Sequence, residues 1–234
     1  MGKITREKFK TYANVFDEFT RRNIFKLATQ GHFEELESSI SLGKEANIFT
    51  ARTKEGELKI VKIYRLENCD FNKMFDYIKY DPRYSSIKKR RREIIFSWAQ
   101  REFRNLLKAR EANVRVPTPH ICLHNIIIMD LIGDKRAAPQ LKDAIPHDPS
   151  AFLQDTINEY RKLLKAGLVH GDLSEFNILN HNEKPVFIDF SQATTIESQN
   201  AKELLERDAK NLARFFNKRG VETNQTEIYQ AITS

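Results

Sequence analysis

Cysteine is scarce in this 234-residue chain: Cys69 and Cys122 are its only two, and they stand far apart in no paired motif. This scarcity excludes a disulfide-stapled secreted scaffold and predicts a reducing, intracellular and cytoplasmic location. Long apolar runs are also missing. The longest, Ile126 to Met129, is far shorter than the about 20 residues that cross a bilayer. The first ten residues, MGKITREKFK, hold no apolar segment, so neither a secretory signal nor a membrane partner is expected.

Basic residues are in excess, and the formal net charge is +7. Apolar residues make up 40% of the chain and charged residues 30%, a balance that predicts a globular protein with ample material for a core. The positive charge favours nucleotide, nucleic-acid or acidic partners, although an ordinary basic surface explains it equally well. It is most concentrated in KKRRR, residues 88–92.

The periodicity of apolar residues divides the chain into helices and strands. It predicts helices over residues 6–29, 92–110, 149–165 and 200–219. A shorter helix is expected at FNKMFDYI, followed by a mobile loop that contains DPRYSS.

Extended segments are concentrated in the first half of the chain. Residues 36–64 read as strands with a hairpin turn at KEGE, and a second strand pair is expected near ICLH and NIIIMDLIG. The sequence therefore predicts an α+β fold with an N-terminal helical extension over residues 1–35, a strand-rich N-lobe over 36–132 and a helical C-lobe over 133–234. A cleft between two such lobes is a common place for a ligand.

Two charged residues interrupt apolar faces. Lys62 shares a strand face with Ile60, and Glu102 lies on the helical stripe that contains Trp98 and Leu106. A lone buried charge is costly, so these two side chains are expected to form an ion pair with each other. The alternative is that each reaches solvent at the edge of its element.

Three polar residues interrupt the apolar stretch of residues 168–190. His170-Gly171-Asp172 followed by Asn177 has the H-x-D-x-x-x-x-N spacing of a kinase catalytic loop, and Asp189 begins a D-F pair typical of metal binding. The segment SLGKEA, residues 41–46, contains one glycine and lacks both G-x-G-x-x-G and the P-loop pattern. By itself it predicts only a turn.

Taken in order, these motifs make the chain resemble the RIO family of atypical serine/threonine protein kinases. SLGKEA resembles the family's nucleotide loop, VKIY its strand lysine, WAQREFRNL its αC-like helix, MDLIG its hinge, HGDLSEFNIL its catalytic loop and IDF its metal loop. The Glu-Ala ending of the nucleotide loop, a short leader and the lack of a long charged tail resemble the first, archaeal-like subgroup.

The resemblance implies a two-lobed, truncated protein-kinase-like fold with an extra N-terminal helix, because only 45 residues follow Asp189 and no A-P-E motif is present. It implies ATP and Mg²⁺ as cofactors, with Mn²⁺ as a substitute. Asp172 and Asp189 would be catalytic, and Asn177 and Asp189 would hold the metal. The implied nucleotide-binding residues are Ser41, Leu42, Gly43, Lys44, Glu45, Ala46, Lys62, Glu102, Met129, Asp130, Leu131 and Ile132.

The implied function is serine/threonine protein phosphorylation with ATPase activity in maturation of the small ribosomal subunit. Asp189 would form a phospho-aspartate. Lys88–Arg92 would contact ribosomal RNA, or alternatively form a solvated entry to the helix. Ser85 and Ser86 are candidate autophosphorylation sites or plain loop serines. The protein substrate stays open, and the chain is expected to be a monomer or weak oligomer.

Rival interpretations share HGD…N…ID. One is a small-molecule kinase of the aminoglycoside or choline type, which usually has a longer helical C-terminal lobe and lacks SxGKEA. A close variant is the short kinase of the tRNA-threonylcarbamoylation complex, whose nucleotide loop differs. A third is a non-catalytic ribosome-assembly factor that ATP switches between conformations. The third would keep every site residue, so the sequence alone does not separate it from an active kinase.

Overall fold

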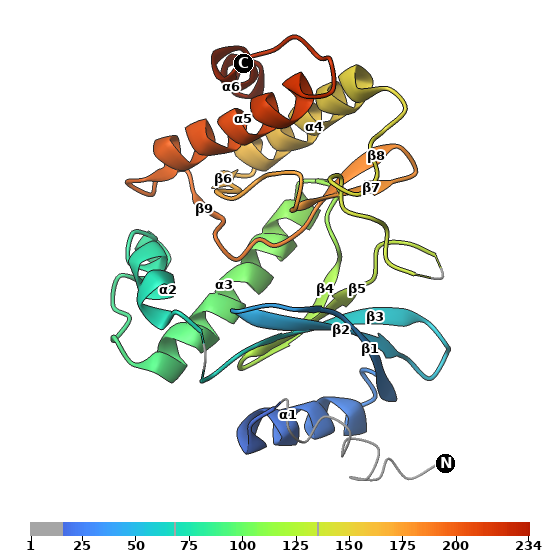
Figure 1. Ribbon diagram of the computed structural model, residues 1–234. Helices are drawn as coiled ribbons and strands as arrows, with labels where there is room; N and C mark the ends of the chain where they lie inside the picture. The colour runs from blue at the N-terminus through green and yellow to red at the C-terminus, as the bar shows by residue number, and fades with distance from the viewer. Residues whose placement is uncertain (1–15, 68, 135) are drawn as a thin grey trace. The chain divides into compact units, whose positions relative to one another are not determined.

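The structure, a computed structural model, describes residues 16–67, 69–134 and 136–234, and the chain forms two compact units (Figure 1). The first unit contains the described residues up to Phe75, together with Ile87–Phe103 and Pro119–Leu131. The second contains Asp76–Ser86, Arg104–Thr118 and the chain from Ile132 onward. The predicted domain limits stay a prediction, because each unit is built from several separate stretches of the chain.

A five-stranded antiparallel sheet forms the first unit, in the order β1-β2-β3-β5-β4. Its strands are β1 (Glu35–Leu42), β2 (Ala46–Arg52), β3 (Leu58–Tyr64), β4 (Pro119–Leu123) and β5 (Ile126–Asp130). The predicted turn at KEGE joins β2 to β3, with Gly56 at φ 86°, a conformation that glycine adopts without strain. Both predicted strand regions are therefore confirmed.

Helix α1 (Glu18–Thr29) packs against one face of this sheet. Asp17 is the N-cap of this helix, and its side chain accepts a hydrogen bond from the Thr20 N–H (3.0 Å). Alternate residues of three strands complete the core beneath the helix: Phe49, Ala51, Val61, Ile63, Ile126 and Ile128. The predicted helix over residues 6–29 is thus confirmed from Glu18, and residues 6–15 lie outside the described part of the chain.

Two helices contribute to both units. They are α2 (Phe71–Ile78), which matches FNKMFDYI, and α3 (Arg91–Glu111), which matches the predicted helix 92–110. Between them lies η2 (Pro82–Tyr84), a single 3₁₀ turn in the segment expected to be a mobile loop. The structure differs from that expectation, since Asp81 and Tyr84 are buried.

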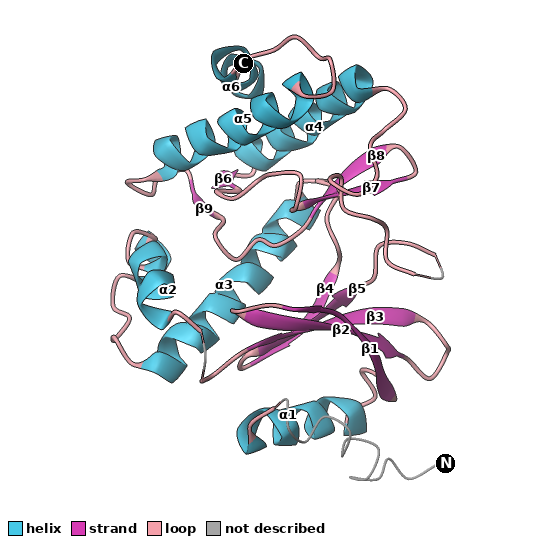
Figure 2. Cartoon of the chain, in the orientation of Figure 1, coloured by secondary structure: helices cyan, strands magenta, loops and turns pink. Residues whose placement is uncertain are grey.

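The second unit is mostly helical, with two short strand pairs (Figure 2). Its helices are α4 (Pro149–Lys165), α5 (Ala201–Asn217) and α6 (Gln225–Thr233), and its strand pairs are β6 (Leu168–Val169) with β9 (Thr194–Thr195) and β7 (Ile178–His181) with β8 (Lys184–Phe187). The predictions for α4 and α5 are confirmed. The capping box of Asn224 and Glu227 starts α6, which the sequence reading missed.

The α+β fold class is confirmed by these two units. Within the described parts of the chain, none of the helices combines the length and apolar character needed to cross a bilayer.

Candidate functional site

The predicted ion pair is present in the first unit. Lys62 Nζ lies 2.7 Å from Glu102 Oε1, and the two residues are only 5% and 1% exposed. The other carboxylate oxygen of Glu102 accepts a hydrogen bond from the Tyr64 hydroxyl. Strand β3 turns Lys62 away from Val61 and Ile63, which face the core under α1. Glu102 therefore fixes the position of an ammonium group that has three donors in all.

Residues 41–46 form the ends of β1 and β2 and the tight turn between them. The Gly43 N–H donates to the carbonyl of Ala46 (3.0 Å), and a Cβ on Gly43 would lie only 2.9 Å from that oxygen. The turn therefore needs glycine for a close approach of backbone to backbone. Leu42 and Lys44 are exposed. The predicted turn is confirmed, and its nucleotide role stays a prediction.

The expected hinge residues divide between the two units after Leu131. Met129 is buried in β5, whereas the Asp130 carboxylate binds Lys59 Nζ at 2.9 Å and His120 Nε2 at 2.7 Å. The carbonyl of Ile132 already accepts a hydrogen bond from the Ala138 N–H (2.7 Å). An adenine contact to this carbonyl would therefore use the second lone pair of the oxygen.

In the second unit, the loop between β6 and β7 brings Asp172 and Asn177 together. Asn177 Nδ2 donates to the backbone carbonyl of Asp172 (2.8 Å) and to its Oδ2 (3.2 Å). The Ile188 N–H donates to the carbonyl of Asn177 (3.0 Å), which ties the chain just before Asp189 to the same loop. The three polar residues that interrupt the apolar stretch are thus held by one hydrogen-bonded structure.

His170 closes this loop from the inside. The ring is fully buried, with Nε2 3.0 Å from the carbonyl of Ile188, and Nδ1 accepts from the Asp172 N–H at 3.4 Å. Both contacts suit one neutral tautomer with the proton on Nε2. His170 therefore positions the backbone at Asp172 and has no exposed surface for a substrate.

Asp189 follows β8 in a left-handed backbone conformation, at φ 60°. This conformation is uncommon for a residue with a side chain and often marks a functional position. The Ser191 N–H lies 3.4 Å from Asp189 Oδ1, and Ser191 is buried. The carbonyls of Phe190 and Ala193 both accept hydrogen bonds from Asn105 Nδ2, at 3.3 and 2.7 Å.

The donor set at Asn177 and Asp189 fits Mg²⁺. Because the Asn177 amide nitrogen donates to Asp172, the amide oxygen is the group left for a cation. The carboxylate of Asp189 is the second candidate ligand. Among the described residues, no group of three or more His, Cys, Asp or Glu side chains could hold a metal ion. Two oxygen ligands from protein are typical for Mg²⁺, which keeps waters and binds substrate phosphates.

Asp208 of α5 is a supporting residue that the sequence reading missed. It is fully buried, and its carboxylate accepts hydrogen bonds from the N–H groups of Gly171 and Leu173 (both 2.7 Å) and from the Tyr160 hydroxyl (2.5 Å). These contacts fix the backbone on both sides of Asp172. The available signal was a charge on the apolar stripe of Leu205 and Leu212.

Burial controls the protonation of this group. Desolvation raises the pKa of Asp208 from 3.8 to about 7, against the opposite effects of its three hydrogen bonds and the charge of Arg207. The pKa of Tyr160 is also raised, first by burial and then by the nearby Asp208. The anchor of the loop is therefore a carboxyl group that titrates near neutral pH.

Comparison with known proteins gives one consistent relationship. A family model described as the RIO domain matches residues 47–229. The chain is 39% identical to the RIO-type serine/threonine-protein kinase Rio1 of Haloferax volcanii over 97% of its own length and 79% of that protein. It is 40% identical to the Rio1 kinase of Methanocaldococcus jannaschii, over 97% of this chain and 78% of the relative.

A solved structure is similar in fold. It is a complex of the Rio2 kinase of Chaetomium thermophilum with ADP, Mg²⁺ and phosphoaspartate, and it matches with a TM-score of 0.72 at 26% identity. The match covers 92% of this chain, which spans 65% of that solved chain.

Proposed function

Because the chain belongs to the RIO family of serine/threonine-protein kinases, we propose that Asp172, Asn177, Asp189 and Lys62 carry its ATP- and Mg²⁺-dependent phosphoryl transfer. The observation that carries these assignments is the contact of Asn177 with Asp172, at 2.8 and 3.2 Å, on the loop tied to the chain before Asp189. It holds a carboxylate and an amide in fixed positions, as metal-assisted phosphoryl transfer requires.

The residues have different roles in the proposed transfer of phosphate to a hydroxyl group. Asp172 orients the attacking hydroxyl and accepts its proton, while its N–H and carbonyl are held by His170 and Asn177. Asn177 and Asp189 hold Mg²⁺, which neutralises charge on the phosphates. Lys62, whose Nζ is held 2.7 Å from Glu102 Oε1, contacts the phosphates. The turn at residues 41–46 offers backbone N–H groups to nucleotide phosphates.

Asp189 is also a proposed nucleophile for ATP hydrolysis. One carboxylate oxygen attacks the γ-phosphorus, the bond to the β-phosphate oxygen breaks, and ADP leaves. Water then cleaves the acyl phosphate to release phosphate and restore Asp189. The solved Rio2 complex, which contains ADP, Mg²⁺ and phosphoaspartate, supports this assignment at the level of the family.

Label from γ-labelled ATP distinguishes the two acceptors. We expect slow Mg²⁺-dependent incorporation into the protein, with acid-stable label on Ser or Thr and hydroxylamine-labile label on Asp189. Ser85 and Ser86 are exposed and are the proposed autophosphorylation sites. The Ser85→Ala, Ser86→Ala double variant should therefore lose acid-stable label, and Asp189→Asn should lose labile label.

α-Labelled ATP is the control, and it should label nothing covalently. Mn²⁺ in place of Mg²⁺ should also support the reaction, because it prefers the same oxygen ligands. ATP binding without any covalent label or phosphate release would contradict the proposal. That outcome would instead support an assembly factor that ATP switches without chemistry.

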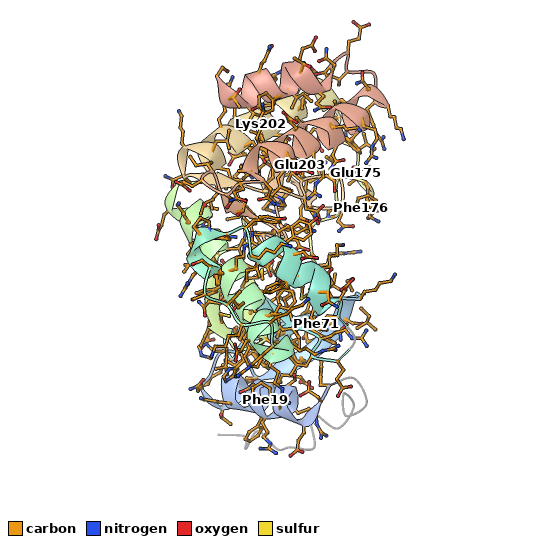
Figure 3. All side chains as sticks on the ribbon, turned by 90° about the vertical axis from the view of Figure 1, so that its left-hand side faces the viewer. Phe19, Phe71, Glu175, Phe176, Lys202 and Glu203 are labelled. Atoms are coloured by element: carbon orange, nitrogen blue, oxygen red, sulfur yellow. The ribbon has the colours of Figure 1, made fainter. Side chains whose placement is uncertain are left out.

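We further propose that the chain acts in the cytoplasm on the precursor of the small ribosomal subunit, and that Lys88–Arg92 contacts its RNA. All five residues are exposed where α3 begins. Arg91 stacks on Phe71, labelled in Figure 3, at 4.6 Å from the ring centroid, and Lys89 stacks on Phe75 at 5.4 Å. Basic groups beside aromatic rings are suited to phosphates and bases.

Binding to small-subunit RNA precursors should weaken as salt increases, because each neutralised phosphate releases counterions. Replacing Lys88, Lys89 and Arg90 with Gln should reduce the slope of log K against log salt by up to about 3. The matched control replaces three exposed lysines, Lys202 (labelled in Figure 3), Lys210 and Lys218, with Gln. If the slope of log K against log salt is equal in the two triple variants, Lys88–Arg92 does not have the proposed role in RNA binding.

A further inference from the structure

Apart from the proposed phosphorylation of Ser85 and Ser86, the segment Asp76–Ser86 has been given no role in the reaction. It precedes α3 in sequence, next to the basic run, yet it packs within the second unit, with Asp172 and Asp189. It contains the end of α2 and the turn η2. Two chains of polar contacts connect it to the two loops that carry these aspartates.

The first link starts at η2. Asp81 is fully buried, and Arg83 binds both of its carboxylate oxygens, with Nε at 2.9 Å from Oδ1 and Nη2 at 2.6 Å from Oδ2. The third nitrogen, Nη1, donates to Asn105 Oδ1 at 2.9 Å. The planar guanidinium can satisfy these three contacts at once, which a lysine cannot do.

Asn105 connects Arg83 to the loop after Asp189. It is fully buried, and its Nδ2 donates to the carbonyls of Phe190 (3.3 Å) and Ala193 (2.7 Å). Since Arg83 is only a donor, it holds the amide oxygen of Asn105 toward itself. The amide nitrogen is thereby directed at the two carbonyls of the loop that carries the proposed metal ligand.

The second link starts at Tyr77 of α2. Its hydroxyl accepts a hydrogen bond from Arg207 Nη1 at 3.1 Å. Arg207 Nη2 donates to the carbonyl of Gly171 and to Gln192 Oε1, the latter at 3.1 Å. Gln192 Nε2 in turn donates to Asp172 Oδ2 at 3.2 Å. Tyr77 is thus connected through two side chains to the proposed proton acceptor.

We propose that the segment Asp76–Ser86 is a positioning element for phosphoryl transfer, with Arg83 acting through Asn105 on the Asp189 loop and Tyr77 acting through Arg207 and Gln192 on Asp172. The proposal rests on the roles given above to Asp172 and Asp189. Arg83 and Tyr77 act on those aspartates through Asn105, Arg207 and Gln192, so both are positioning residues.

The two links have different measurable consequences. Loosening the first link disturbs a metal ligand, so it weakens binding of Mg²⁺. Loosening the second disturbs the carboxylate that orients the hydroxyl, so it lowers kcat and leaves Mg²⁺ binding unchanged. Partners of this kind, one contact away from a reactive or metal-binding group, typically contribute about 10- to 100-fold.

The test compares two conservative variants of the full chain. Arg83→Lys keeps a cation beside Asp81 and removes the contact with Asn105. We expect the Mg²⁺ concentration for half-maximal autophosphorylation to rise about 10-fold. Tyr77→Phe keeps the ring beside Arg207 and removes only the hydroxyl. We expect kcat to fall about 10-fold, with the KM for ATP and the Mg²⁺ requirement changed less than about twofold.

The matched controls make the same two types of substitution at exposed positions. Tyr80→Phe alters an exposed tyrosine of the same segment, and Arg22→Lys alters an arginine that is paired with Glu18 and 71% exposed. Both should retain the kcat and the Mg²⁺ requirement of the unmodified chain. Thermal unfolding of every variant separates loss of folded protein from loss of positioning.

Wild-type kcat and Mg²⁺ requirement in Arg83→Lys and Tyr77→Phe would overturn the proposal. The proposal would also be overturned if both variants lost activity only in proportion to their loss of folded protein. Asp172→Asn and Asp189→Asn run beside them test the roles on which the proposal rests. If these two remain active, the assignment of the site has failed, whatever the positioning variants show.

Discussion

Replacing Asp172 with Ala abolishes detectable transfer of phosphate to protein, a loss of about 10²- to 10⁴-fold, because the attacking hydroxyl loses the group that orients it and accepts its proton. ATP binding stays within a few-fold, since Asp172 is not among the proposed nucleotide contacts. Autophosphorylation with γ-labelled ATP measures the first quantity, and equilibrium binding of ATP measures the second.

Two further variants make this result specific. Asp172→Asn keeps the shape of the side chain, so its packing against Asn177 and Gln192 changes little. This variant should be nearly as inactive as Asp172→Ala. Asp143→Ala removes an exposed carboxylate of the same unit, 59% accessible, and should retain activity. Autophosphorylation retained in both Asp172 variants would show that this residue is not the proton acceptor.

Replacing Asp208 with Ala should have the largest effect on stability. It leaves three donors without their acceptor, the N–H groups of Gly171 and Leu173 and the hydroxyl of Tyr160. Each buried unsatisfied group costs about 1–3 kcal/mol, so the free energy of unfolding should fall by about 3 kcal/mol or more. Asp208→Asn keeps one accepting oxygen and should lose less. Denaturant unfolding measures both, with Asp143→Asn as the control.

The pH dependence of stability provides an independent measurement on the same residue. The pKa of Asp208 is raised from 3.8 to about 7, so the folded state holds its proton more tightly than the unfolded state. The contribution is fully present below pH 3.8 and is lost as the pH rises through about 7. Within this interval the free energy of unfolding should fall by up to about 1.4 kcal/mol per pH unit.

Asp208→Asn cannot titrate at this position, so its destabilisation relative to the unmodified chain should shrink between pH 5 and pH 8. Other ionisable groups are common to both proteins and cancel in the difference. Parallel stability curves over this range would show that Asp208 is ionised throughout.

Local periodicity was enough to predict much of the fold. Helices α3 and α4 were predicted within one residue of their observed ends, because their apolar stripes are long. Helix α4 also begins at a cap, Asp148, and at Pro149. The loop after α2 that contains DPRYSS was misjudged as mobile, and the contacts of α2 were not foreseen, because the partners of both are remote in sequence. Arg83 reaches Asn105 over 22 residues, and Tyr77 reaches Arg207 over 130.

In the site, too, contacts between residues that are remote in sequence were only partly predictable. Lys62 and Glu102 could be paired from sequence because both are charges on apolar faces and each is the natural partner of the other. Asp208 carries the same signal, a carboxylate on an apolar stripe. Its main partners, however, are backbone N–H groups of Gly171 and Leu173, which every residue except proline possesses. A pattern of side chains therefore cannot identify them.

The anchoring of the loop by Asp208 also sets the order in which function appears during synthesis. Asp208 lies 37 residues after Gly171 and 35 after Leu173. A nascent chain that already contains every proposed reactive residue still lacks the acceptor that fixes the loop around Asp172. We therefore expect phosphoryl transfer to begin only after α5 has left the ribosome and folded. A chain interrupted before this helix would carry every proposed reactive residue without the acceptor that fixes the loop around Asp172.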